Sequence, residues 1–128
     1  MKKTSLFALL AVIAGFFLLQ SNKSFQTVQT GGDFYSAEAK SIIDKKCYGC
    51  HSIKGRSQDA RDALMWDSLP GLPKAKIVAS INDIIKAVKE DKMPPETMVA
   101  RMPEMKMQPE EKTALLQWSE KKAESLLK

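Results

Sequence analysis

The sequence contains very little of the two residue types that most often hold soft metals and redox cofactors. Its 128 residues include two cysteines and one histidine, and all three lie in the stretch Cys47-Tyr48-Gly49-Cys50-His51. Structural zinc needs four ligands, and no second Cys/His pair exists to complete such a site. A disulfide between two cysteines so close in sequence has poor geometry and would leave His51 unexplained.

The sequence also lacks any β-strand pattern, because no segment alternates apolar and polar residues over several positions. The cysteine pair therefore lacks the βαβ context of a thioredoxin-like dithiol. Clustered lysines and arginines with interleaved aromatic residues are absent as well, so nucleic-acid binding finds no support. We predict an all-α protein.

The cysteines and the histidine form the motif C-x-x-C-H, which is the attachment sequence of a c-type haem. Two thiols on one helical turn can each add across one vinyl group of the haem, and the adjacent imidazole then lies under the iron. We therefore predict one haem c, bound covalently through Cys47 and Cys50, with His51 as the proximal iron ligand.

The longest apolar run lies at the N-terminus, where Lys2 and Lys3 precede residues 6–19. As a helix this run would be about 21 Å long, which is shorter than the ~30 Å hydrocarbon core of a membrane. The layout favours a cleaved signal peptide, but residues 20–23 offer no clear small-x-small cleavage site. An uncleaved anchor is the alternative. Either way we expect an exported, periplasmic protein, free or tethered to the inner membrane by residues 6–19.

The rest of the chain divides into a tether and one folded domain. Residues 1–20 are the predicted signal peptide or membrane anchor. Residues 21–35 are mostly polar and include Gly31 and Gly32, which predicts a flexible tether. Residues 36–128 form the predicted haem-binding domain, which is small enough that a covalently held haem would supply much of its apolar interior.

The first half of the domain is expected to contain two helices. Ser36 is a good N-cap for a helix that runs into the haem motif, and a second helix is expected over residues 58–66. Four residues of the first helix follow a 4-4-3 spacing and share one face: Ala39, Ile43, Cys47 and Cys50.

The second half of the domain is expected to contain two more helices. The third is predicted to start at Ser80, because Ser80 and Asp83 resemble a capping box, and to stop before the prolines that follow Met93. Apolar residues recur along it at helical spacing: Ile81, Ile84, Ile85 and Val88. The last helix is predicted to begin at Pro109, a favourable first-turn residue.

The iron needs a second axial ligand opposite His51, and with no other histidine a methionine sulfur is expected. Met93 is the predicted ligand, because it follows an amphipathic helix and precedes two prolines whose fixed φ stiffens the segment. Met102 is the second candidate, and most of the remaining methionines are expected to pack in the core.

These motifs together resemble a small monohaem c-type cytochrome, similar to the bacterial, Bacteroidetes-type haem-binding domain family with CxxCH and MPP motifs. The matching stretches are Cys47–Ser52, Trp66–Leu69, Met93–Pro95 and Pro103–Glu104, with Trp118. The resemblance implies a class I cytochrome c-like domain of about four helices around one haem, with N- and C-terminal helices crossing and iron between His51 and Met93. Relatives often carry His or Tyr at the position of Met102, which keeps that residue open as a ligand.

The expected function is electron transfer, and we predict a carrier that is not an enzyme. A His/Met pair leaves no free iron position, and the sequence lacks the distal acid-base group of a haem peroxidase. The formal charge of +5 falls to about +3 without Lys2 and Lys3, which suits docking to acidic redox proteins of the membrane or periplasm, or to anionic membrane surfaces.

Two other functions are consistent with the sequence. The abundance of methionines allows a haem-based sensor or small-ligand-binding module whose sixth ligand is labile. The thioether cluster of Met102, Met105 and Met107 resembles sites that bind Cu(I) outside the cytoplasm.

Overall fold

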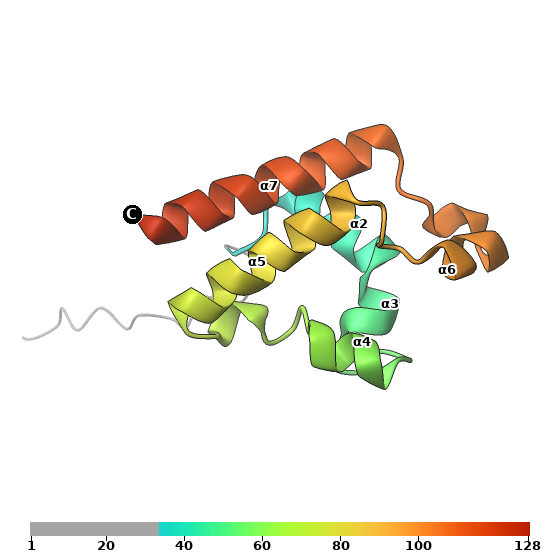
Figure 1. Cartoon of the computed structure of the whole chain (residues 1–128), viewed down its shortest axis with the longest axis horizontal. Helices are drawn as coiled ribbons and strands as arrows, with labels where there is room; N and C mark the ends of the chain where they lie inside the picture. Colours follow the sequence, from blue (N-terminus) through green and yellow to red (C-terminus); the bar gives the residue numbers. More distant parts are fainter. Residues whose placement is uncertain (1–33) are drawn as a thin grey trace, which may run out of the picture. The chain divides into compact units, whose positions relative to one another are not determined.

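The computed structural model describes residues 34–128, which fold into helices and connecting turns (Figure 1). These residues contain no strand, which confirms the all-α prediction. The helices are α2 (Ala37–Lys46), α3 (Tyr48–His51), α4 (Gln58–Ala63), α5 (Lys74–Lys89), α6 (Glu96–Arg101) and α7 (Pro109–Leu127), with 3-10 turns η1 (Leu69–Gly71) and η2 (Pro103–Met105). The segment predicted as signal peptide or anchor lies outside the described residues, as does most of the tether. Among the described helices, none is long and apolar enough to cross a membrane.

The first helix starts where the sequence predicts. The side-chain oxygen of Ser36 accepts a hydrogen bond from the backbone N–H of Ala39, so it caps α2. The helix ends at Lys46, because the backbone of Cys47 departs from helical geometry at φ −120°. The separate turn α3 then carries the rest of the haem motif. The cysteines therefore lie on a bent continuation of α2 and not on one unbroken helix.

Helix α5 starts at Lys74, directly after Pro73, and not at Ser80 as the apparent capping box suggested. The buried residues show why, because the apolar face begins before Ser80 and continues without a break: Ile77, Ile81, Ile84 and Val88. The helix ends at Lys89, before Met93, as predicted.

Two further differences concern short helices. Helix α4 ends at Ala63 and not at residue 66, because Leu64 is extended. Helix α6 was not predicted, since its six residues are too few to show a periodic apolar face. The described domain thus has six α-helices where about four were expected.

The core forms where α7 packs against α5 and α2, and Figure 1 shows α5 and α7 side by side. Aromatic rings extend this core, because Tyr35 packs against both Trp66 and Trp118. Tyr35 is only 8% exposed, and its hydroxyl donates to the carbonyl of Trp66 at 2.7 Å. The ordered domain therefore includes Phe34 and Tyr35, which the sequence assigned to the end of the tether.

Candidate functional site

A cavity of about 490 Å³ lies beside the haem motif. Its lining brings together the four residues singled out from the sequence: Cys47, Cys50, His51 and Met93. Much of the remaining lining is apolar and comes from three other parts of the fold, with Trp66, Ile84 and Leu115 as examples. Both the volume and the apolar lining are typical of cofactor sites.

His51 is held in one orientation and one tautomer. Its Nδ1 atom lies 2.8 Å from the carbonyl oxygen of Ala60 and 3.0 Å from that of Leu64. Both oxygens can only accept, so Nδ1 must carry the proton and donate it. In the neutral imidazole the Nε2 atom then keeps a free lone pair, which is the state of a metal-binding histidine.

The two cysteines are placed by the turn that begins at Cys47. The backbone N–H groups of Cys50 and His51 both donate to the carbonyl of Cys47, at 3.1 and 3.0 Å. Burial, reinforced by the nearby Cys50, raises the pKa of the Cys47 thiol to about 12, and the opposing effect of Lys46 is smaller. Before haem attachment, Cys47 is therefore a protonated thiol at neutral pH.

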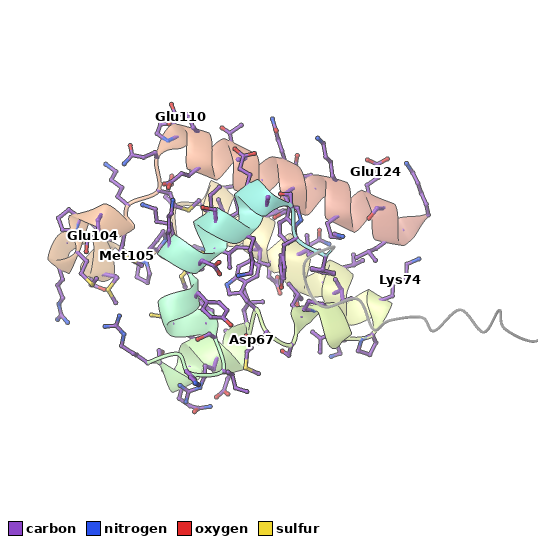
Figure 2. All side chains as sticks on the ribbon, turned by 180° about the vertical axis from the view of Figure 1, so that it is seen from behind. Asp67, Lys74, Glu104, Met105, Glu110 and Glu124 are labelled. Carbon is purple, nitrogen blue, oxygen red and sulfur yellow. The ribbon has the colours of Figure 1, made fainter. Side chains whose placement is uncertain are left out.

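We call residues 47–67 the histidine wall of the cavity. A hydrogen bond closes this segment, because the backbone N–H of Trp66, near its end, donates to the carbonyl of His51, near its start, at 2.9 Å. The carboxylate of Asp67 accepts from the Tyr48 hydroxyl and, at 2.7 Å, from the N–H of Ile53; Figure 2 shows Asp67 close to α3. Partial desolvation acts to raise the pKa of Asp67, but these hydrogen bonds outweigh it and lower the pKa below 3.8.

The contact between Tyr48 and Asp67, which stabilises the histidine wall, was not predicted from the sequence. Tyr48 and Asp67 are separated by eighteen intervening positions and belong to no helical or strand repeat. Only the fold brings them together.

Trp66 itself packs in the aromatic core at 3% exposure, and its indole Nε1 has no hydrogen-bond partner among the described residues.

We call residues 93–107 the methionine wall. Three of its methionines line the cavity: Met93, Met98 and Met105. Met102, the second candidate ligand, is not among the lining residues. Met98 and Met105 therefore join Met93 as methionines of the cavity, and neither had a distinguishing signal in the sequence.

The three methionines considered for Cu(I) binding, Met102, Met105 and Met107, lie in different environments. Met105 faces the haem-site cavity, whereas Met107 packs against the hydrophobic core. Met102 belongs to neither group. Soft-metal binding by thioethers needs the sulfur atoms on one centre, so this arrangement gives no support to a copper site.

The fold and the site together define a class of protein. It is a small helical domain in which a C-x-x-C-H turn borders an apolar cavity, and the imidazole of that turn is oriented for metal binding. Residues 36–122 match the Cytochrome c family, and the chain belongs to that family. Comparison with curated proteins and with solved structures gives no match.

Family membership confirms the prediction of a c-type cytochrome with one covalently attached haem c. The residues at the cavity fit such a group, because two thiols, an imidazole with a free Nε2 and several thioethers meet around an apolar space. The family supports haem-based electron transfer, and its members are generally electron carriers that work with redox partners.

Proposed function

We propose that this protein is a periplasmic monohaem cytochrome that carries single electrons through a haem held between His51 and Met93. The observation that carries the proposal is that both residues line one cavity with Cys47 and Cys50, although they come from distant parts of the chain. We further propose that it belongs to the Bacteroidetes-type group with CxxCH and MPP motifs, and that residues 1–20 direct its export or anchor it to the inner membrane.

The histidine wall supplies the covalent and proximal contacts. The thiols of Cys47 and Cys50 would hold the haem, each adding its S–H across one vinyl group to give a thioether. Nε2 of His51 would bind the iron, while the carbonyls of Ala60 and Leu64 fix the imidazole plane and increase its basicity. When bound, the haem supplies an iron that gains or loses one electron.

Met93 completes the proposed site from the opposite wall. Its thioether is a soft ligand that favours reduced iron and raises the potential. Pro94 and Pro95 have fixed φ angles, which lowers the entropy lost when the sulfur is held in place. With His51 and Met93 both holding the iron, no position would be left for a substrate, so the chain would act as a carrier between redox proteins and not as an enzyme.

The ligand assignment is tested by optical spectra of the holoprotein in both oxidation states. The Met93→Ala variant is expected to lose the far-red ferric band of a Met–iron bond. Met98→Leu and Met105→Leu are matched controls, because they alter sulfur atoms of the same cavity and are expected to keep the band. Persistence of the band in Met93→Ala, with its loss in one of the controls, would move the sixth ligand to that residue.

A second function has one observation in its favour. Met98 and Met105 line the same cavity as Met93, so more than one thioether could compete for the iron. A labile Met–iron bond would make the protein a sensor or small-ligand-binding module. Carbon monoxide distinguishes the two, since rapid stoichiometric binding to the ferrous protein at neutral pH requires an open or weakly held sixth position.

A further inference from the structure

One side chain makes the hydrogen bonds between the methionine wall and the rest of the described domain. Within residues 34–128, the hydrogen bonds that join residues 93–107 to other segments all come from Lys46. Its Nζ atom donates to the carbonyl of Glu104 at 2.5 Å and to that of Lys106 at 3.0 Å. These two carbonyls flank Met105, which lines the cavity; Figure 2 shows Glu104 and Met105 together in this segment.

The ammonium group of Lys46 is also withdrawn from solvent. Its side chain is 10% exposed, and Nζ lies 3.4 Å from a carboxylate oxygen of Glu111. The same oxygen accepts the backbone N–H of Gln108 at 2.9 Å, at the start of α7. Lys46 therefore joins the end of α2 to η2 and to the first turn of α7.

The contacts of the Lys46 ammonium group are made to protein groups. Two of its three N–H donors bond to carbonyls, and a carboxylate lies beside it. Although Lys46 also lines the cavity, these contacts hold it to η2 and to α7. Its role is to fix protein segments relative to one another.

Lys46 links the methionine wall to the haem attachment motif, because of its position in the chain. Lys46 directly precedes Cys47, so the backbone that carries the haem attachment is tied to the segment that carries the methionines. We propose that Lys46 is a positioning residue that holds the methionine wall against the iron and thereby sets how labile the sixth ligand is. This inference rests on the proposed His51/Met93 ligation.

The test compares carbon monoxide association with the ferrous holoprotein in three lysine variants, by stopped-flow absorbance. Lys46→Met keeps the apolar stem but removes every donor, and is expected to bind at least about tenfold faster than wild type, which corresponds to about 1.4 kcal/mol. Lys46→Arg keeps the charge and the donors and is expected to stay within about threefold. Lys45→Met is the matched control, because Lys45 is exposed and makes none of these contacts; it is expected to match wild type.

Hydrogen exchange provides a readout that does not depend on iron ligation. In Lys46→Met the amides of Met105 and Lys106, which bond within η2, are expected to exchange at least about tenfold faster, while those of α7 keep their rates. If Lys46→Met fails to fold, Glu111→Gln takes its place, with smaller changes in the same direction. Unchanged exchange, or faster exchange without faster binding in a protein that keeps the far-red ferric Met–iron band, overturns the role of Lys46. A wild-type protein that lacks this band and binds carbon monoxide rapidly and stoichiometrically would instead refute the Met93 ligation.

Discussion

The two walls of the cavity are built in different ways. The histidine wall is closed on itself by contacts between residues distant in sequence, such as Trp66 N–H to the carbonyl of His51. The methionine wall has only local hydrogen bonds of its own, such as Met105 N–H to the carbonyl of Met102. Its attachment to the other described segments by hydrogen bonds depends on Lys46.

The difference separates two requirements of an electron carrier. A proximal histidine that is fixed in tautomer and plane keeps the iron in one place through many redox cycles. A sixth ligand on a segment with few external contacts can be adjusted by small changes outside the cavity. Stability is therefore concentrated on one wall and adjustability on the other.

The largest expected effect comes from the closest backbone contact of the histidine wall. A Cβ atom added at Gly55 would overlap the carbonyl of Cys50, and backbone cannot move aside as a flexible side chain can. Gly55→Ala is expected to lower the free energy of unfolding by about 3 kcal/mol or more, measured by urea denaturation of the holoprotein.

The matched control is Gly71→Ala, because a Cβ at Gly71 meets nothing within 4 Å. It is expected to change stability by less than about 1 kcal/mol. Equal effects of the two substitutions on the free energy of unfolding would show that the backbone at Gly55 is no more tightly packed than the backbone at Gly71.

A somewhat smaller effect is expected in wild-type protein, where the amides of the two walls should differ in their rate of hydrogen exchange. The amide of Met105 is expected to exchange with solvent at least about 100-fold faster than that of Trp66, because its hydrogen bond breaks when a single local turn opens. Residue-resolved hydrogen exchange by NMR measures both amides in one sample. Similar protection at the two positions would contradict the contrast between the walls.

The smallest effect concerns Asp67, which is exposed and braces the histidine wall through Tyr48 and Ile53. Asp67→Asn is expected to cost at most about 1 kcal/mol at pH 7, since solvent screens the interaction. The pKa of Asp67 is lower in the folded protein than the ordinary 3.8, so its stabilisation is present above about pH 4 and is lost as pH falls through the folded value.

The measurement is the unfolding free energy of wild type and Asp67→Asn between pH 7 and pH 2.5. The two curves are expected to approach each other as the pH falls below the ordinary carboxyl pKa of 3.8. Tyr48→Phe removes the hydroxyl donor from the same contact and is expected to reproduce part of the loss at pH 7. A difference between wild type and Asp67→Asn that stays constant down to pH 2.5 would exclude the carboxylate as its source.

Sequence patterns located the helices better than they located their ends. The start of α2 at Ser36 and of α7 at Pro109 followed from capping rules that depend only on neighbouring residues. The start of α5 was placed too late, because Ser80 has the residue type of a cap but lies within an apolar face that packs on α7. Burial along a whole face outweighed one local signal.

The sequence by itself determined the chemistry of the site. Two cysteines and their spacing indicated a covalently attached haem, with the adjacent histidine as the predicted iron ligand, because attachment depends on local geometry within one helical turn. Only the tertiary structure decided which methionines line the cavity, namely Met93, Met98 and Met105 but not Met102. It also joined Lys46 to η2. Such contacts connect segments far apart in the chain, and no local pattern records which of several similar side chains the packing turns inward.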